Sequence, residues 1–291
     1  MKTTVFKSEQ AKVVLTQWFD RFRAKLEVPT ESRVVQTRFG ATHVLVGGPE
    51  NGAPLVLLHG AMASSAHALV ELAPLLRAFR VYAVDVVGQS VKSADARPSV
   101  SNDEYGRWLA EVMDGLSLPR AQVVAVSWGG FVAIRLAALA PRRITRLVLL
   151  VPAGLVSGSA WAGFLKMGLP MALYLMAPSE ARLQKFVKHL LTTTNDDWAP
   201  YLGDAFRSFN MNMTVPMLAK PEELKGFTAP TLVLAADNDV SFPGQKVLDR
   251  AVELFPSLAG TELIKGSLHC PPTTDEFRAW LGGRITSFMQ G

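Results

Sequence analysis

Short β-branched runs alternate with helical patterns through most of this 291-residue chain, and few folds accommodate such an order. The runs predicted as strands are 41–46, 54–58, 80–85, 122–126, 147–151, 231–235 and 261–264. The helices predicted around them lie near 66–78, 102–116, 130–140, 245–254 and 274–289. Alternation of this kind indicates an α/β fold with a mostly parallel sheet covered by helices on both faces.

The alternation is interrupted once, by a largely helical stretch between two predicted strands. The predicted division is an N-terminal helical segment, a core in two parts and a helical insertion between those parts. The corresponding ranges are 1–33 for the N-terminal segment, 34–152 and 225–291 for the core, and 153–224 for the insertion.

The N-terminal segment contains an apolar stripe at helical spacing, formed by Leu15, Trp18, Phe19, Phe22 and Leu26. We expect this stripe to pack against the main body, because helices of this kind bury their apolar face on their own domain. A surface anchor is the alternative, and a homodimer contact is also compatible with the stripe.

Composition restricts the partners. The formal charge of +5 comes from scattered cations, which favours a solvated surface and argues against nucleic-acid binding. The lone cysteine, Cys270, excludes an intrachain disulfide and a CxxC-type metal site.

Glu9 and Lys12 interrupt the start of the chain, so we expect no signal peptide and a cytoplasmic protein. The apolar stretch 161–177 contains Lys166 and Pro170, so it does not predict a transmembrane helix, which needs about 20 apolar residues.

A serine follows one predicted strand at a sharp turn. The pentapeptide Ala125-Val126-Ser127-Trp128-Gly129 resembles the G-x-S-x-G nucleophile elbow of α/β-hydrolases, with alanine in place of the first glycine. Glycines after the serine let the following helix start close to the strand, which leaves the Ser127 hydroxyl exposed above the sheet. We predict Ser127 as a nucleophile.

A second turn precedes the helix predicted near 66–78. His59-Gly60-Ala61-Met62 resembles the loop that supplies a backbone N–H to the oxyanion hole in the same family. We predict that the N–H groups of Ala61 and Trp128 are the two donors, with Met62 as the fallback for Ala61. His59 is expected to tie down this loop.

Two further residues complete a serine hydrolase pattern. Asp239 follows the strand predicted at 231–235, and His269 follows the last predicted strand, so Ser127, Asp239 and His269 occur in the chain order of the family. His269 is the candidate general base, and Asp239 is preferred over Asp237 as its carboxylate partner. Cys270 is expected to be a small packing residue beside the base.

The chain is therefore identified as a member of the α/β-hydrolases, most similar to bacterial carboxylesterases. The passages that carry the resemblance, besides the motifs above, are TRFGATHV at 37–44, YAVDVVG at 82–88 and TLVLAADND at 231–239. The family often has a second glycine two residues after the one at position 88, and here that position is Ser90, which affects the local turn. The resemblance implies an esterase with a helical cap, residues 153–224, acting on a small-molecule ester with no cofactor or metal.

The substrate is less constrained. The candidate pocket residues Trp161, Phe164, Met167, Met171 and Met176 suit apolar acyl or aryl groups, or else they only pack the cap on the core. No arginine clamp is evident in the cap, which argues against a charged substrate.

Several activities fit the same three residues. Thioester, amide or C–C bond hydrolysis, acyl transfer and cofactor-free haloperoxidation all remain open. A serine nucleophile argues against haloalkane dehalogenase and epoxide hydrolase chemistry. A non-catalytic ligand-binding protein with this fold is the alternative from another class.

Overall fold

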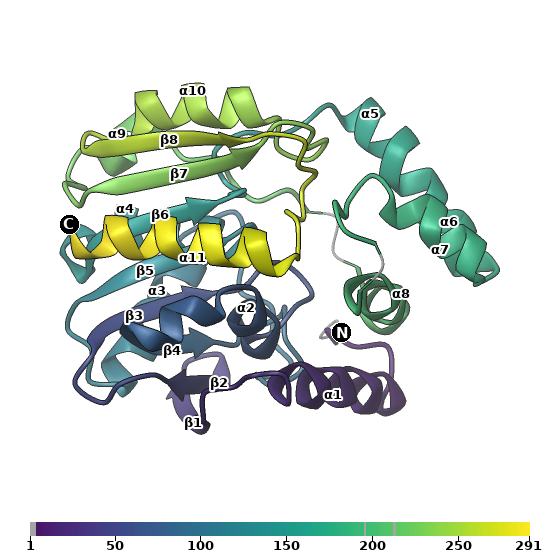
Figure 1. The fold of residues 1–291 in the computed structure, drawn as a ribbon, viewed down its shortest axis with the longest axis horizontal. Helices are drawn as coiled ribbons and strands as arrows, with labels where there is room; N and C mark the ends of the chain where they lie inside the picture. Colours follow the sequence, from purple (N-terminus) through teal and green to yellow (C-terminus); the bar gives the residue numbers. More distant parts are fainter. Residues whose placement is uncertain (1–3, 195, 212–213) are drawn as a thin grey trace.

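The computed structural model describes residues 4–194, 196–211 and 214–291, and these parts build an eight-stranded sheet in the order β1-β2-β4-β3-β5-β6-β7-β8 (Figure 1). The strands are β1 (Thr30–Thr37), β2 (Gly40–Gly47), β3 (Ala53–Leu58), β4 (Phe79–Val84), β5 (Ala121–Val126), β6 (Ile144–Leu150), β7 (Thr231–Ala236) and β8 (Leu258–Ile264). The pairs β1–β2 and β2–β4 are antiparallel, and the other pairs are parallel. The predicted mostly parallel sheet is confirmed.

Helices surround this sheet. The α-helices are α1 (Glu9–Arg23), α2 (Ser65–Glu71), α3 (Glu104–Gly115), α4 (Trp128–Leu139), α5 (Ala160–Gly163), α6 (Leu169–Met176), α7 (Glu180–Val187), α8 (Trp198–Ser208), α9 (Pro221–Leu224), α10 (Gly244–Leu254) and α11 (Asp275–Gln290). Shorter turns are the 3₁₀ helices η1 (Ala73–Arg77) and η2 (Pro141–Arg143) and the π-helix η3 (Phe164–Gly168).

The sheet is buried on both faces, as its continuous apolar strands require. Side chains alternate along a strand, so Val123 and Ala125 of β5 join one core cluster with Trp108 of α3, while Val124 joins a second cluster. That second cluster contains Ile285 of α11, which crosses in front of the sheet in Figure 1.

Two predicted elements differ from the structure. β1 was missed because its sequence is polar and its side chains are mostly exposed, with only Val35 buried, as suits an edge strand. The helix predicted at 66–78 is divided into α2 and η1, because Pro74 has no N–H to continue an α-helical ladder.

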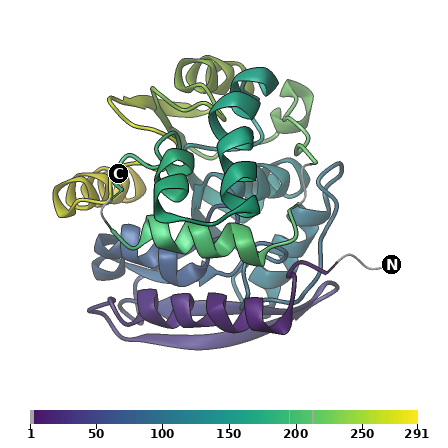
Figure 2. The ribbon, with the colours of Figure 1, turned by 90° about the vertical axis from the view of Figure 1, so that its right-hand side faces the viewer.

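The segment between β6 and β7 contains α5 to α9; its helices α5 to α8 lie beyond the end of the sheet at which the parallel strands finish, whereas α9 lies beside α10 at the other end (Figure 1). Figure 2 shows this face directly, with α8 running beside α1 and the shorter helices above them. These inserted helices therefore lie over the edge of the sheet where the turn between β5 and α4 is located.

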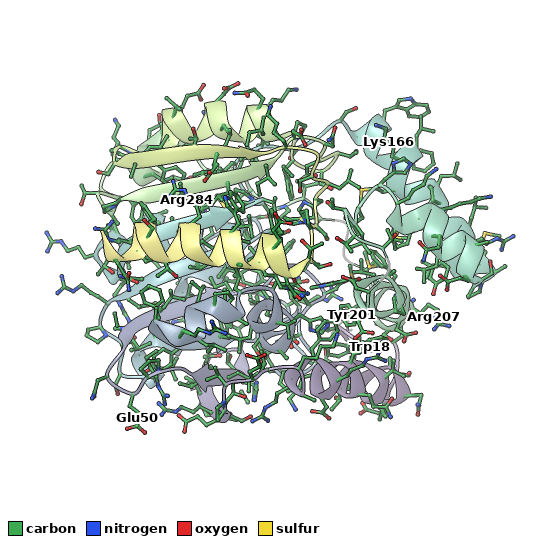
Figure 3. All side chains as sticks on the ribbon, viewed as in Figure 1. Trp18, Glu50, Lys166, Tyr201, Arg207 and Arg284 are labelled. Carbon is green, nitrogen blue, oxygen red and sulfur yellow. The ribbon has the colours of Figure 1, made fainter. Side chains whose placement is uncertain are left out.

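The N-terminal helix packs on the main body, as predicted. Leu15, Phe19 and Phe22 are buried, and Phe22 stacks against His67 of α2 with ring centroids 3.9 Å apart. Trp18 meets Tyr201 of α8 edge to face at 5.8 Å, and Figure 3 shows the two side chains between their helices. Within the described ranges, no helix is both long and apolar enough to cross a membrane.

Candidate active site

Ser127 occupies a strained turn between β5 and α4. Its φ of 49° and ψ of −112° lie in a region that residues with a side chain rarely adopt. Hydrogen bonds hold the turn in place, from Ser127 N to Leu150 O (2.9 Å) and from Ala153 N to Ser127 O (2.9 Å). Strain of this kind is stored where surrounding structure enforces it, which makes the residue a functional candidate.

The two glycines after the serine permit close packing of α4. A Cβ on Gly129 would lie 2.7 Å from the carbonyl oxygen of Leu58, and one on Gly130 would lie 2.7 Å from Cβ of Pro152. Ala125, two residues before the serine, is fully buried. Small residues are therefore required on both sides of Ser127 for the turn to form.

The structure brings Ser127, His269 and Asp239 together. Ser127 Oγ lies 2.9 Å from His269 Nε2, and His269 Nδ1 lies 2.7 Å from Asp239 Oδ2. The other carboxylate oxygen of Asp239 accepts the backbone N–H groups of Ser241 (2.7 Å) and Phe242 (3.0 Å). The carboxylate is thus fixed on both oxygens and orients the imidazole toward the serine.

Asp237 is turned elsewhere. Its carboxylate accepts the N–H groups of Gly266 and Ser267, each at 3.0 Å, and so holds the loop that leads to His269. Asp237 thus caps this loop, and Asp239 is the acid that contacts the imidazole.

The tautomer of His269 follows from its neighbours. A carboxylate only accepts hydrogen bonds, so Nδ1 carries the hydrogen that bonds to Asp239, and Nε2 has a lone pair for the Ser127 hydroxyl. Burial disfavours the charged ring, but the charge of Asp239 and its hydrogen bond outweigh burial and raise the pKa of His269.

Two backbone N–H groups adjoin the serine. Trp128 is the first residue of α4, so its N–H has no partner within the helix. Ala61 N–H donates to no acceptor in the described part of the chain, whereas Met62 N–H donates to Gln89 Oε1 at 3.2 Å. The geometry therefore favours Ala61 over Met62 as a free donor.

His59 is part of the turn that presents these donors. Its Nδ1–H donates to Gly60 O (2.7 Å), and Nε2 accepts Val86 N–H (2.9 Å). Burial lowers the pKa of His59, although the charge of Asp85 acts in the opposite direction. A neutral imidazole that forms a hydrogen bond at each ring nitrogen fixes the loop, as expected from the position of His59.

An apolar cavity of about 310 Å³ opens beside Ser127. Its wall includes side chains from the junction of α2 and η1, from the inserted segment and from α11: Leu72, Met167, Leu190, Leu202, Phe206 and Phe277. Of the five predicted pocket residues, Met167 alone lines this cavity. Trp161, Phe164 and Met176 are 70%, 53% and 82% exposed, and Met171 packs against the core, so the structure does not bring these four to the cavity.

The cavity also has lining residues that sequence reasoning missed. His67 of α2 and Trp198, Leu202 and Phe206 of α8 belong to its wall. The helical pattern of α8 shows an apolar face, but a single sequence does not say that this face turns toward Ser127. Gln89, whose side chain accepts the hydrogen bond of Met62 N–H, lies between the passage 82–88 and Ser90, but nothing in that passage indicated its contact with the turn.

Cys270 adjoins His269 without taking part in its hydrogen bonds. Burial raises the pKa of this thiol to about 12, and nearby carboxylates act in the same direction. Its backbone bonds to the inserted segment, through Cys270 N to Leu190 O and Thr192 N to Cys270 O. No cluster of three or more metal-ligating side chains occurs among the described residues.

Comparison with known proteins places the chain in a family. The family described as the alpha/beta hydrolase fold matches residues 53–272. The chain is 27% identical over 286 residues to the carboxylesterase YbfK of Bacillus subtilis, covering 94% of this chain and 93% of that protein. It is 29% identical over 258 residues to a second Bacillus subtilis protein, the uncharacterized carboxylesterase nap, covering 83% and 81%.

Solved structures agree on the fold. Naproxen esterase from Bacillus subtilis superposes with a TM-score of 0.80 at 25% identity, covering 97% of this chain and 99% of that one. The carboxylesterase CesB (YbfK) from the same organism gives a TM-score of 0.79 at 24% identity, covering 96% and 98%. The expected similarity to bacterial carboxylesterases is confirmed.

Proposed function

The chain belongs to the α/β-hydrolase family, and from this we propose that it is a carboxylesterase in which Ser127 is the nucleophile, His269 the general base and Asp239 the acid of a triad. The observation that carries the proposal is the hydrogen-bonded chain from Ser127 Oγ through His269 to Asp239, set on a strained turn. An apolar cavity beside the serine supplies room for the acyl or aryl part of an ester.

Acylation begins when the Ser127 oxygen attacks the ester carbonyl carbon and its proton passes to His269 Nε2. A hydroxyl is a weak nucleophile until a base removes this proton, and the 2.9 Å separation permits the transfer. Asp239 stabilises the imidazolium that results. The tetrahedral intermediate then collapses, and the proton on Nε2 leaves with the alcohol.

The negative oxygen of the intermediate needs donors that are already in place. In the proposal these are the backbone N–H groups of Ala61 and Trp128, since Met62 N–H is engaged by Gln89. The loss of one such donor costs about a hundred- to a thousandfold in rate. Fixed backbone donors need no rearrangement as charge develops.

Deacylation repeats these steps with water. His269 removes a proton from a water molecule, which attacks the acyl carbonyl, and the proton returns to Ser127 Oγ as the acid is released. Residues 153–224 act as a cap in this proposal, because Met167, Leu202 and Phe206 of this segment line the cavity and limit access of bulk water.

The test is hydrolysis of p-nitrophenyl esters of graded acyl length by the wild type and by Ser127→Ala. We expect activity that peaks at one chain length and a loss of about 10³-fold or more in the variant. Full activity in Ser127→Ala would show that the nucleophile is misassigned.

A fluorophosphonate label separates the remaining activities. Labelling of Ser127 without hydrolysis of any ester would indicate an amide, thioester or C–C bond as the substrate, since the same three residues serve those reactions. A folded protein that is neither labelled nor active would support the non-catalytic alternative.

A further inference from the structure

A second cavity, of about 80 Å³, lies next to the proposed oxyanion donors. Ala61, Met62 and Trp128 line both this small cavity and the large apolar one, so the two adjoin at the backbone that would hold the reacting carbonyl. The rest of the small cavity is lined by the loop between β4 and α3, which contributes Gln89 and Arg97, by Tyr105 of α3 and by residues 209–211.

The small cavity contains buried donors without acceptors. Nε of Arg97 is buried and its N–H reaches no acceptor within the described ranges. Nε1 of Trp128 is buried too and meets no acceptor at full hydrogen-bond geometry among those residues, although it lies close enough to the Tyr105 hydroxyl to lower the pKa of that phenol. One terminal nitrogen of Arg97 donates to the carbonyl oxygens of Asn210 and Val5, the latter at 3.4 Å. Indole and guanidinium N–H groups cannot accept hydrogen bonds, so this cavity fits a ligand atom that accepts them.

Arg97 also has no counter-ion among the residues that the structure describes. The carboxylates of Asp95 and Glu104, close to it in the sequence, accept the backbone N–H groups of Val5 (2.5 Å) and Ser99 (2.6 Å). Neither carboxylate forms an ion pair with Arg97 in the described structure. A partly buried guanidinium without an anion is an unfavourable arrangement unless a ligand supplies the charge.

Tyr105 does not supply that charge. Its hydroxyl donates to Val87 O at 3.3 Å, and burial raises its pKa to about 12, although Gln89, Trp128 and Arg97 beside it act in the opposite direction. The phenol therefore stays neutral near pH 7. The small cavity then combines one uncompensated cation with neutral groups.

We propose that this small cavity binds a carboxylate carried by the substrate, while the apolar part of the same ester occupies the large cavity. Arginine is suited to this contact because its planar N–H groups match a carboxylate. The inference rests on the proposed esterase function and narrows its substrate to esters with a free acid group. It departs from the expectation of an uncharged substrate, which considered only residues 153–224, because the arginine comes from the β4–α3 loop.

Two matched pairs of esters test this inference, because the acid group can be on either side of the ester bond. The p-nitrophenyl hemiester of glutaric acid is compared with p-nitrophenyl pentanoate, and meta-carboxyphenyl butyrate with phenyl butyrate. For each pair the ratio of kcat/KM, acid over neutral, is measured in the wild type, Arg97→Gln, Arg97→Lys and Arg107→Gln. Arg107 is exposed and its side chain lies outside both cavities, so it controls for the loss of one positive charge.

In at least one pair we expect Arg97→Gln to lower the ratio by about tenfold or more, the range expected for a charge-assisted hydrogen bond. Arg97→Lys should retain part of the preference, and Arg107→Gln should keep the wild-type ratio. Equal ratios in the wild type and Arg97→Gln for both pairs would overturn the inference while leaving the esterase proposal intact. If Arg97→Gln does not fold, a wild-type ratio below one in both pairs would overturn it instead.

Binding of the same esters to Ser127→Ala, measured by calorimetry, tests the inference without turnover. We expect the acid member of one pair to bind about tenfold more tightly than its neutral partner, and Arg97→Lys in the same background to weaken that difference. Equal binding of both members of each pair would contradict the inference. Tighter binding of an acid ester by a protein whose wild type hydrolyses no ester would instead uphold the cavity and refute the esterase function.

Discussion

Trp18 and Asp204 lie 186 positions apart in the chain, and the indole Nε1 of Trp18 donates to Asp204 Oδ2 at 2.8 Å. This bond joins α1 to α8, and the Trp18 ring also contacts Tyr201 on α8 (Figure 3). Because α8 carries Leu202 and Phe206 of the large cavity, the N-terminal helix supports one wall of the candidate active site.

Trp18→Phe should therefore weaken both the fold and substrate binding. The variant keeps an aromatic ring but loses a hydrogen bond to a carboxylate, so we expect a loss of about 1–2 kcal/mol in the free energy of unfolding. KM for a p-nitrophenyl ester should rise, because α8 is less firmly held. Urea unfolding followed by circular dichroism measures the first effect, and steady-state kinetics the second.

Val13→Ala is the matched control on the same helix, since Val13 is 47% exposed. It should change the free energy of unfolding by no more than about 0.5 kcal/mol. If Trp18→Phe were as stable as Val13→Ala, the bond to Asp204 would contribute nothing to the attachment of α8.

Gly129→Ala should damage the turn that presents Ser127. The added Cβ would lie 2.7 Å from both Cβ and the carbonyl oxygen of Leu58, and backbone cannot move away cheaply. We expect a cost of about 1–3 kcal/mol in stability and a marked fall in kcat, because the hydroxyl would shift relative to His269. Thermal unfolding and p-nitrophenyl ester kinetics measure the two effects.

Gly283→Ala provides the opposite case. Gly283 lies within α11, and a Cβ there meets no atom within 4 Å, so alanine should raise stability by up to about 1 kcal/mol through its higher helix propensity. Equal stability of the two variants would mean that the close approach to Leu58 is not what requires glycine at position 129.

The small residues around Ser127 also show why this turn could be predicted from the sequence. A strand, a serine and small residues on both sides are all local, and local geometry decides whether such a turn forms. The meeting of Ser127, Asp239 and His269 could be predicted in the same way, since each of the three follows a strand that was predicted from the sequence. Parallel strands end at one edge of the sheet, which brings the three side chains together.

The pocket could not be predicted in this way, because its wall depends on contacts between distant segments. α5, η3 and α6 are apolar on nearly all sides, so periodicity did not distinguish Met167, which faces the cavity, from the exposed Trp161 and Met176. The partly buried position of Arg97 depends on the carbonyl groups of Val5 and Asn210, which lie 92 and 113 positions away. No pattern in a single sequence predicts a contact between residues so far apart in the chain.

Cys270 should be unreactive in the folded protein. With a pKa of about 12, about one thiol in ten thousand is ionised at pH 8, and only the thiolate is alkylated. We expect iodoacetamide to label Cys270 at least a hundredfold more slowly in the native protein than in urea, as followed by mass spectrometry. Esterase activity should survive the native treatment. Rapid native labelling with loss of activity would instead make this thiol a candidate nucleophile.

The pH dependence of kcat/KM should reveal the contact between His269 and Asp239. His269 must be neutral to accept the proton of Ser127, and Asp239 raises the pKa of His269 above its ordinary value of 6.5. Activity should therefore rise with pH, with a midpoint above 6.5 in the wild type. A profile with its midpoint below 6.5 would contradict this direction.

Asp239→Asn removes the charge and leaves burial, which lowers the pKa of His269, so the midpoint of the profile should move to lower pH. The amide can also bond to the wrong tautomer of the ring, so kcat should fall by about 10³–10⁴-fold. Asp237→Asn is the matched control, because among the described residues Asp237 accepts only from the loop N–H groups of Gly266 and Ser267 and from Asn238. It should leave the midpoint in place, and a shift of equal size in both variants would show that the imidazole responds to general charge and not to its bond with Asp239.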